Sequence, residues 1–375
     1  MRIVHVCINN PFVEGMGYQE NMISNYQVQD GNEVFVISIN LIYNDKYWKH
    51  VPTGITKYEG VNVIRLSHHR LTWGLIFPHG LYKSLKNIQP HVIMHHNVNC
   101  TSLVICEWYC MFNKNCKLIA DNHADYINCN QNTKIQWGLY KILIGGSQKI
   151  LGRYTKFYYG VSYMRCDFLK DMFKLPSKKI KFLPIGTDVT FANTIASKPI
   201  LKEKYNVSKS AFIIVSGGKM GKQKGTDTLI LAIEEMRKQG GNYELYLFGK
   251  FEDKETQELI QSKEFVHFTG WCDRQKTLEL LKLSDIAIWA IHHTTLVEDA
   301  VSVETPLILR KTRTTEHLIN GNGVFIQKGT KEEIMEAIST MIKSINDNTT
   351  KEACKRLKDS LNYRNISLSI LTDIA

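Results

Sequence analysis

The segment from Gly217 to Gly225, GGKMGKQKG, concentrates residue types that bind phosphate. It follows an apolar run and precedes residues at helical spacing, so we expect a loop that joins a strand to a helix. Backbone N–H groups at a helix start interact favourably with an anion, and Lys219, Lys222 and Lys224 add positive charge beside them. The loop matches neither Walker A nor G-x-G-x-x-G, which argues against ATP hydrolysis and dinucleotide binding. The alternative is a lysine-rich turn that contacts only solvent.

His123 is the second candidate for chemistry. It comes just after an expected strand and two residues before Asp125. We expect it in a binding cleft, where its ring would form a hydrogen bond with a ligand; the alternative is a histidine with a purely structural place. His95, His96, His292 and His293 are weaker candidates.

The nine cysteines do not predict a metal site or a disulfide framework. Their number is odd, and Cys106, Cys110 and Cys116 lack the C-x-x-C spacing of zinc ligands. Reduced thiols are the better interpretation. The sequence also contains no Asp-x-Asp, so we expect neither a metal nor another cofactor.

Two α/β units must position these residues. Residues 2–8 and 33–39 are expected strands with an intervening glycine turn and helix, which is the start of a parallel, doubly wound sheet. The pattern begins again at Ala211, with further strands expected at 212–216, 243–248, 265–268, 286–290 and 307–309. In such sheets ligands bind beyond the carboxyl ends of the strands. Two units facing each other across a cleft predict an enzyme with two substrates.

The composition agrees with a globular protein of two domains. The chain has 375 residues, 43% of them hydrophobic and 22% charged. Residues 1–186 contain 21 Lys and Arg against 11 Asp and Glu, a balance of +10 out of the total of +11. A basic half suits nucleic acid, an anionic membrane or a polyanionic substrate, unless it is only a solvated face.

A segment rich in aromatic and basic residues favours the membrane among these partners. Residues 136–163 interleave lysine and arginine with tryptophan, tyrosine and phenylalanine, as surfaces that contact anionic lipid do. Stacking on nucleic-acid bases and a half-buried helix are the alternatives. The N-terminus lacks the features of a signal peptide and the sequence has no long apolar run, so we expect a cytoplasmic protein at the inner face of the plasma membrane.

The motifs in this order resemble the GT-B glycosyltransferases, and within them the retaining enzymes of family 4 (glycosyl transferases group 1). The family's second domain carries Gly-Arg-Leu, three residues and Lys-Gly, to which residues 218–220 and 224–225 (GKM, KG) are similar. The resemblance extends to segments along nearly the whole chain, namely residues 1–17, 89–95, 117–125, 182–188 and 265–271. It implies an acceptor-binding domain over residues 1–185, a nucleotide-sugar domain over 186–355, and a helix within 356–375 that crosses back onto the first domain.

The resemblance also implies functional residues. It gives catalytic roles to His123, Lys219, Lys224 and Glu298. It places at the donor Gly15, Gly17, Gly218, Trp271, Cys272, Thr294, Thr295 and Asp299. On the acceptor side it places Tyr18 and Asp125.

One segment departs from the family pattern. The family has two glutamates eight positions apart and then a glycine before a Thr-Pro pair. Here Ile291 stands in the first glutamate position, Asp299 in the second with Glu298 beside it, and Glu304 in place of the glycine.

The function implied is transfer of a sugar, with retention, from a nucleotide-sugar (a UDP-sugar by preference) to a glycan or lipid-linked saccharide. The setting would be surface polysaccharide biosynthesis, with no nucleic-acid partner. Two alternatives remain open: a non-catalytic subunit that binds a partner transferase, and a nucleotide-sugar epimerase on the same fold.

Overall fold

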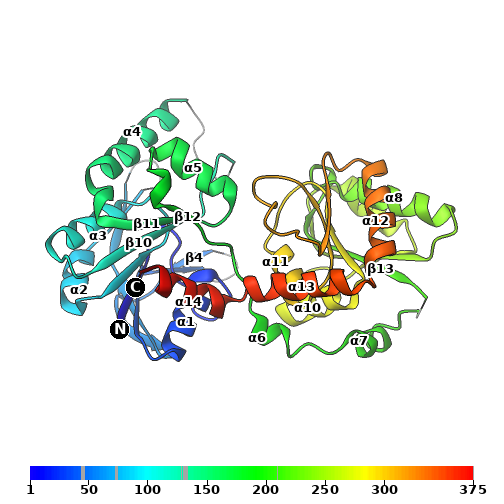
Figure 1. The fold of residues 1–375 in the computed structure, drawn as a ribbon, viewed down its shortest axis with the longest axis horizontal. Helices are drawn as coiled ribbons and strands as arrows, with labels where there is room; N and C mark the ends of the chain where they lie inside the picture. Colours follow the sequence, from blue (N-terminus) through cyan, green and yellow to red (C-terminus); the bar gives the residue numbers. More distant parts are fainter. Residues whose placement is uncertain (44–46, 72–74, 128, 130–133, 209, 375) are drawn as a thin grey trace. The chain divides into compact units, whose positions relative to one another are not determined.

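The structure is a computed structural model that describes residues 1–43, 47–71, 75–127, 129, 134–208 and 210–374 (Figure 1). Its helices are α1 (Gln19–Gln29), α2 (Leu81–Ile88), α3 (Thr101–Phe112), α4 (Lys134–Leu151), α5 (Tyr163–Phe173), α6 (Val189–Ala192), α7 (Lys198–Lys204), α8 (Thr226–Lys238), α9 (Lys254–Gln261), α10 (Arg274–Leu283), α11 (Leu296–Ser302), α12 (Lys331–Ser344), α13 (Asn348–Ser360) and α14 (Tyr363–Ile374), with 3₁₀ turns η2 (Gly152–Tyr154), η3 (Ser177–Lys179) and η4 (Lys222–Lys224). Its strands are β1 (Arg2–Cys7), β2 (Glu33–Ile39), β3 (Leu41–Tyr43), β4 (Trp48–His50), β5 (Gly54–Tyr58), β6 (Val61–Leu66), β7 (His68–Arg70), β8 (Ile76–Pro78), β9 (Val92–His95), β10 (Lys117–Asn122), β11 (Thr155–Gly160), β12 (Ile180–Phe182), β13 (Phe212–Met220), β14 (Tyr243–Phe251), β15 (Val266–Phe268), β16 (Ile286–Trp289), β17 (Leu307–Arg310) and β18 (Gly323–Ile326).

The chain forms two compact units. Unit 1 comprises residues 1–184 and 363–375, and unit 2 comprises residues 185–362. The expected start of a separate last segment at residue 356 falls inside α13. Helix α13 belongs to unit 2 because Leu357, and Leu361 just after the helix, are buried in the core of that unit. The segment that returns to unit 1 is α14.

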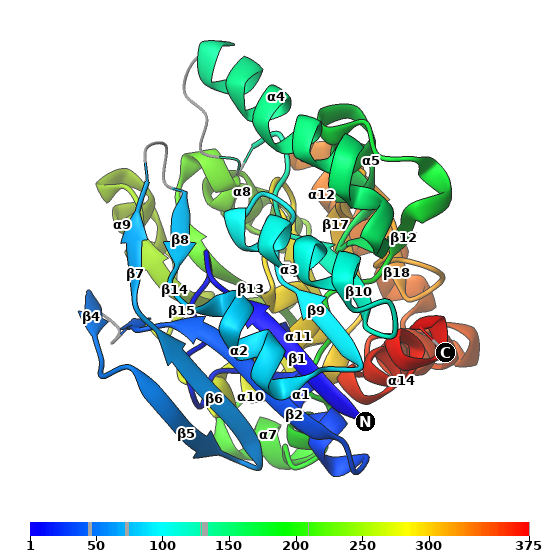
Figure 2. The ribbon, with the colours of Figure 1, turned by 90° about the vertical axis from the view of Figure 1, so that its left-hand side faces the viewer.

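Unit 1 is built on a largely parallel sheet with strand order β12-β11-β10-β9-β1-β2-β6-β5, in which only β5 is antiparallel to its neighbour. Side chains alternate between its two faces, as the pleat of a strand requires. Val4 and Val6 pack with α2, α3 and α5, whereas Ile3 packs with α1 and α14. Helices therefore cover both faces (Figure 2).

Helix α14 is held on unit 1 by polar contacts as well as apolar ones. The hydroxyl of Tyr159 donates to Asp373 Oδ2 (2.7 Å), and Lys181 pairs with Asp373 Oδ1 (2.5 Å). Lys117 and Lys156 donate to the carbonyl of Ile374 at 2.6 and 3.0 Å. Two cations at the end of a helix satisfy carbonyls that have no partner within the helix.

Unit 2 contains a parallel sheet with strand order β15-β14-β13-β16-β17-β18. This is the doubly wound order in which the first strand along the chain, β13, lies beside the second and the fourth. Helices α8, α9 and α12 cover one face, and α7, α10, α11 and α13 cover the other. The winding reverses between β13 and β16, where the flanking loops diverge and leave room for a ligand.

The glycine-rich segment is shorter as a loop than the sequence indicates. β13 continues through Met220, because residues 217–220 pair in register with residues 248–251 of β14. Only residues 221–225, which contain the turn η4, connect β13 to α8. Lys219 therefore stands on a strand, whereas Lys222 and Lys224 stand on the turn.

Candidate functional site

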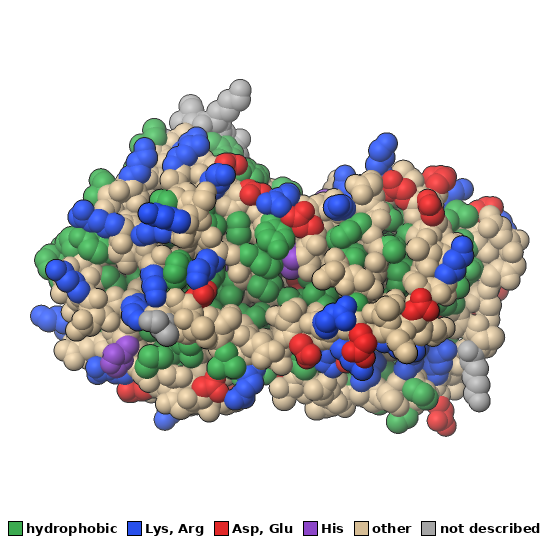
Figure 3. Space-filling view, viewed as in Figure 1, with side chains coloured by type: hydrophobic (Ala, Val, Ile, Leu, Met, Phe, Trp, Pro, Cys, Tyr) green, Lys and Arg blue, Asp and Glu red, His purple; other side chains and the backbone are tan. Residues whose placement is uncertain are grey.

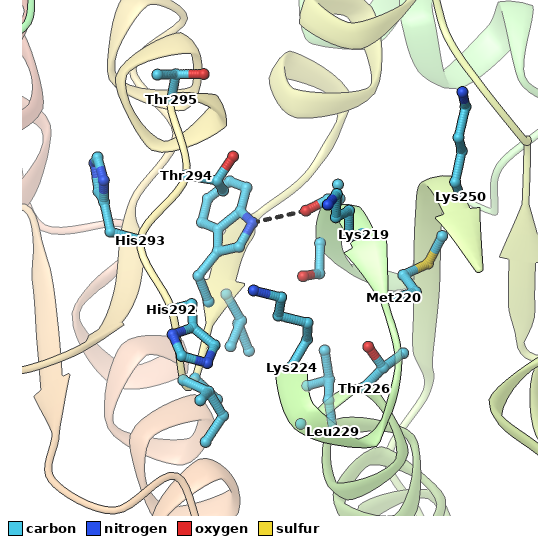
Figure 4. A pocket seen from close by; sticks show the side chains of 18 of the residues that line it. Lys219, Met220, Lys224, Thr226, Leu229, Lys250, His292, His293, Thr294 and Thr295 are labelled. Atoms are coloured by element: carbon cyan, nitrogen blue, oxygen red, sulfur yellow. Dashed lines mark hydrogen bonds between the residues drawn. The ribbon is translucent and has the colours of Figure 1, made fainter. Parts of the chain in front are cut away.

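A pocket of about 590 Å³ lies in unit 2 where the winding of the sheet reverses. It is lined by the end of β13, the turn η4, the start of α8, and residues 288–295 from the end of β16 onward (Figure 4). Lys250 from the end of β14 and Trp271 from the connection between β15 and α10 complete the lining. Lys219, Lys224 and Lys250 are among the lining residues. None of the described residues that line the pocket is Asp or Glu, so its fixed charge is positive.

Glycines allow the backbone to form this pocket at two positions. Gly218 has φ +112° and Gly225 has φ +71°, values that L-residues rarely adopt. A Cβ at Gly225 would also lie 2.8 Å from Cγ1 of Ile291, on the opposite wall. Glycine at 225 thus permits close approach of the η4 turn to residues 289–295.

The lysines of this region differ in their surroundings. Lys219 is highly exposed and lies 3.7 Å from Glu252, which is a loose ion pair. Lys224 extends between η4 and the segment that carries His292 (Figure 4). Lys250 lies over the ring of Trp271, with Nζ 5.1 Å from the ring centroid. Lys222 is not among the lining residues and pairs with Glu255 instead.

The opposite wall is the segment that follows β16. Trp289 Nε1 donates to the carbonyl of Gly217 at 3.0 Å and so joins the two strand ends. Burial, together with the charges of Lys224 and Arg310, lowers the pKa of His292, which keeps its imidazole neutral at pH 7. His293 Nε2 lies 2.9 Å from Glu298 Oε1. Thr294 and Thr295 complete this wall just before α11.

Six of the residues implied by the resemblance line the pocket. They are Gly218, Lys219, Lys224, Trp271, Thr294 and Thr295. Cys272, Glu298 and Asp299 lie nearby in the chain but are not among the lining residues. Glu298 is 2% exposed, and its contact with His293 makes it a support for the wall. Burial raises the pKa of Asp299 to about 6, despite the charge of Arg274.

The remaining predicted residues belong to unit 1. His123 follows β10, and its ring is 28% exposed. Asp125 is buried, accepts a hydrogen bond from the N–H of Ile127 (2.9 Å) and contacts Arg165 at 3.2 Å, so its carboxylate stabilises a turn. Gly15, Gly17 and Tyr18 lie in the exposed connection from β1 to α1, where Gly15 has φ +79°.

Two of the departures from the family pattern, at Ile291 and Glu304, have structural counterparts. Ile291 lines the pocket and contributes an apolar side chain where the family has a carboxylate. Glu304 has φ +62°, the left-handed conformation that favours glycine. Its carboxylate pairs with Lys358 Nζ at 2.8 Å, which ties the end of α11 to α13.

The cysteines take no part in the pocket. The structure describes all nine and joins none of them in a disulfide, and all but Cys166 are buried. Within the described part of the chain, no group of three or more His, Cys, Asp or Glu side chains has the arrangement of a metal site.

Sequence reasoning missed Lys250. It lies beyond the expected end of its strand at Gly249, but β14 continues to Phe251 and places Lys250 beside Lys219. The available signal was the tripeptide Phe248-Gly249-Lys250, a glycine and a cation at the end of an apolar strand next to the glycine-rich segment.

The comparisons with known proteins agree with this arrangement. Residues 197–359, most of unit 2, match the family Glycosyl transferases group 1. An uncharacterized glycosyltransferase of Methanocaldococcus jannaschii is 24% identical over 255 residues, which are 64% of this chain and 61% of that protein. The aligned part thus spans less than two thirds of that relative.

Solved structures with the same fold cover almost the whole chain. The HepE protein of Anabaena, determined with UDP, has a TM-score of 0.71 at 13% identity and covers 99% of each chain. Sucrose-phosphate synthase of Thermosynechococcus elongatus has a TM-score of 0.68 at 14% identity and covers 99% of this chain and 97% of its own. The α/β class and the GT-B fold predicted from the sequence are confirmed. The chain has the fold of the GT-B glycosyltransferases, and most of unit 2 matches the family Glycosyl transferases group 1.

Proposed function

We propose that the protein transfers a sugar from a UDP-sugar to a glycan or lipid-linked saccharide, with retention at the anomeric carbon, in the biosynthesis of a surface polysaccharide. The pocket at the winding reversal of unit 2 carries this proposal. Three lysines and no carboxylate among its described lining residues suit a ligand with two phosphate groups. Its volume is in the range of pockets that hold a ligand of nucleotide size.

UDP is the favoured nucleotide because HepE, which has the same fold, was determined with UDP and with UDP-glucose. Trp271, 76% exposed at the edge of the pocket, offers a flat apolar surface to a base. Retention rests on the resemblance to family 4 described above.

In the proposed reaction the bond between the anomeric carbon and the diphosphate oxygen breaks, and a hydroxyl oxygen of the acceptor bonds to the same carbon. The leaving diphosphate gains negative charge and takes up the proton of that hydroxyl. Lys219 and Lys224 would stabilise that charge, because cations fixed in a pocket interact with the transition state more strongly than with the ground state. Thr294, Thr295 and backbone N–H groups near η4 would hold phosphate oxygens. No metal or other cofactor enters this scheme.

The proposal is tested by calorimetric titration with UDP, GDP and ADP, followed by assays of hydrolysis and transfer with the matching nucleotide-sugars. We expect micromolar binding of UDP and weaker binding of the other two. Tighter binding of GDP or ADP would change the donor but keep the reaction class. If none of the three binds, the protein is the non-catalytic subunit, and unit 2 is a scaffold. Proton NMR of the first product distinguishes retention from inversion by its anomeric coupling.

We also propose that unit 1 contacts an anionic membrane from the cytoplasmic side, where a lipid-linked acceptor would lie. Lys and Arg side chains are spread over the part of Figure 3 that unit 1 occupies, with few acidic ones among them. Helix α4 exposes Ile142, Leu143 and Ile150 next to Lys141 and Lys149, a combination that suits an anionic interface. No helix in the described parts of the chain is long and apolar enough to cross a membrane.

The aromatic residues expected at such an interface are partly in the core. Tyr158 and Tyr159 are 0% and 1% exposed, so these side chains cannot contact lipid. Trp137 is partly buried and packs on Phe168. The side chain of Tyr140 lies outside those that the structure describes. The membrane proposal therefore depends on the outer face of α4.

Co-sedimentation with phosphatidylglycerol vesicles tests the proposed membrane contact. We expect Ile142→Ser with Ile150→Ser to reduce binding at least fivefold, and high salt to weaken binding of the unchanged protein. Ile200→Ser, at another exposed isoleucine, on α7 of unit 2, is the control. Absence of binding at low salt would remove the membrane from the proposal.

A further inference from the structure

A buried network of histidines lies at the winding reversal of unit 1, which is between β1 and β9. His5 Nδ1 is 3.0 Å from His96 Nε2, and His5 Nε2 is 2.8 Å from Gln27 Oε1. His96 Nδ1 is 2.6 Å from Asp121 Oδ2. His5 and Asp121 are fully buried and His96 is 4% exposed, so these contacts form without solvent.

The contacts determine where the protons are. Gln27 Oε1 and the carboxylate of Asp121 can only accept, so His5 donates through Nε2 and His96 donates through Nδ1. Burial and the charge of His96 lower the pKa of His5 to about 3, so His5 is neutral and its Nδ1 is an acceptor. His96 must therefore donate through Nε2 as well. A ring that donates from both nitrogens is an imidazolium.

The charges agree with this assignment. Burial by itself would lower the pKa of His96, but the carboxylate of Asp121 raises it above the ordinary value. Burial would likewise raise the pKa of Asp121, but His96 and His123 hold it well below the ordinary value. His96 and Asp121 thus form a buried ion pair, which is costly unless each member is hydrogen-bonded.

The ion pair of His96 and Asp121 is next to His123. Asp121 Oδ2 is 3.6 Å from His123 Nε2, an ion-pair distance. Asp121 Oδ1 accepts the N–H of Asn97 (3.0 Å), and Asn97 Oδ1 accepts the N–H of His123 (3.2 Å). Arg165 Nε donates to the carbonyl of His123 at 2.8 Å. The backbone of His123 is therefore held at both its N–H and its carbonyl, and its ring lies next to the carboxylate of Asp121.

Asn97 adopts a strained conformation within this arrangement. Its φ of +75° is unusual for a residue other than glycine, and such strain persists where the surroundings impose it. The carboxylate of Asp121 supplies the contact that holds the Asn97 N–H in place. Strained residues of this kind are concentrated at functional sites.

We propose that Asp121, with His96 as its buried counter-ion, is a positioning residue that orients His123 for the transfer reaction. The ring nitrogens of an imidazole point in diverging directions, so the contact of Nε2 with Asp121 directs Nδ1 away from the carboxylate, at the sheet edge where β1, β9 and β10 end. A proton on Nε2 of His123 would face the carboxylate of Asp121, which can only accept. This inference rests on the proposed transferase function, but its first test does not.

That first test is NMR of the full chain labelled with [15N]histidine at pH 8. Other ionisable groups near the network are His95, Glu20, Cys7 and Cys100, and of these only His95 carries the label. We expect one ring protonated on both nitrogens, absent in His96→Gln, and the Nε2–H tautomer for His123. All rings neutral at pH 8, or an Nδ1–H tautomer for His123, would overturn the proposal whether or not the protein is a transferase.

The second test is kinetic. We expect Asp121→Asn to lower kcat at least tenfold, to change the KM for the nucleotide-sugar less than twofold, and to leave the affinity of unit 2 for UDP unchanged. His96→Gln should behave similarly, whereas His91→Gln, at the other end of β9, should not alter kcat. Unchanged kcat in a folded Asp121→Asn protein would show that the ion pair is only structural. A wild-type protein that binds UDP but transfers no sugar would count against the proposed function instead.

Discussion

Lys219 and Lys250 occupy the same register on the parallel strands β13 and β14, and both line the pocket of unit 2. Two like charges on neighbouring strands repel each other and destabilise a sheet. Lys219 has only a loose contact with Glu252, and Lys250 lies over the ring of Trp271. Under the proposed function, a bound diphosphate would neutralise both.

Loss of Lys224 should abolish transfer and leave the fold intact. We expect Lys224→Ala to lower kcat/KM at least a hundredfold, as removal of a group that stabilises transition-state charge does. Circular dichroism and the Tm should not change, because the side chain faces the pocket. Lys222→Ala is the matched control, since Lys222 stands on the same turn but pairs with Glu255. Turnover of Lys224→Ala at the wild-type rate would remove this residue from the mechanism.

Loss of Lys250 should weaken nucleotide binding. A hydrogen bond to a charged group contributes about 1.5–3 kcal/mol, so Lys250→Ala should raise the Kd for UDP at least tenfold. Calorimetry at two salt concentrations measures this, and the salt dependence of binding should also decrease. Lys254→Ala, at an exposed lysine paired with Glu258, should bind UDP normally. Equal affinities of the two variants would place Lys250 outside the donor site.

At position 304 a glycine variant should be more stable than an alanine variant, which is the reverse of the usual order. Glu304→Gly removes left-handed strain of about 1 kcal/mol but also the partly exposed pair with Lys358, which is worth about as much, so the free energy of unfolding should change little. Glu304→Ala loses the pair and keeps the strain, and should be about 1 kcal/mol less stable than the glycine variant.

Chemical denaturation measures the difference between the two variants. The control is Lys351, an exposed residue within α13. There the alanine variant should be more stable than the glycine variant, as is usual in a helix. The same order at both positions would show that Glu304 is unstrained.

Glu107 should make stability depend on pH. This carboxylate on α3 is buried, and burial raises its pKa to about 7 although Thr155 and Gln148 donate to it. Between pH 4.5 and about 7 the unfolded chain loses this proton first, so the contribution of Glu107 to stability decreases as the pH rises.

The measurement is chemical denaturation of the wild type and Glu107→Gln at pH 5 to 8. The free energy of unfolding of the variant should increase relative to the wild type by roughly 3 kcal/mol over this range. A difference that does not vary with pH would mean that Glu107 is ionised in the folded protein throughout.

Much of the fold and part of the pocket could be predicted because their signals are local. Apolar runs such as residues 33–39 and 286–289 specify buried strands, since each must hide its side chains whatever its neighbours are. The glycines and lysines of residues 217–225 lie within nine positions, so their common chemistry is visible along the chain. The glycine position occupied by Glu304 was implied by the resemblance to the family and not by a local pattern.

Other features depend on which strands are neighbours. Lys250 joins Lys219 only through the register of β13 and β14. His5, His96 and Asp121 are far apart in the sequence and meet because β1, β9 and β10 are adjacent. Tyr158 and Tyr159, which the sequence suggested for a membrane surface, are buried under helices on opposite faces of one sheet.

The sequence by itself determined two α/β units and a cationic, glycine-rich connection suited to phosphate, because periodicity and turn chemistry act over a few residues. Only the tertiary structure decided which cations share the pocket, which carboxylates are buried in ion pairs, and which aromatic residues reach the surface. Strand pairing and burial are set by contacts between distant parts of the chain, and no local pattern encodes them.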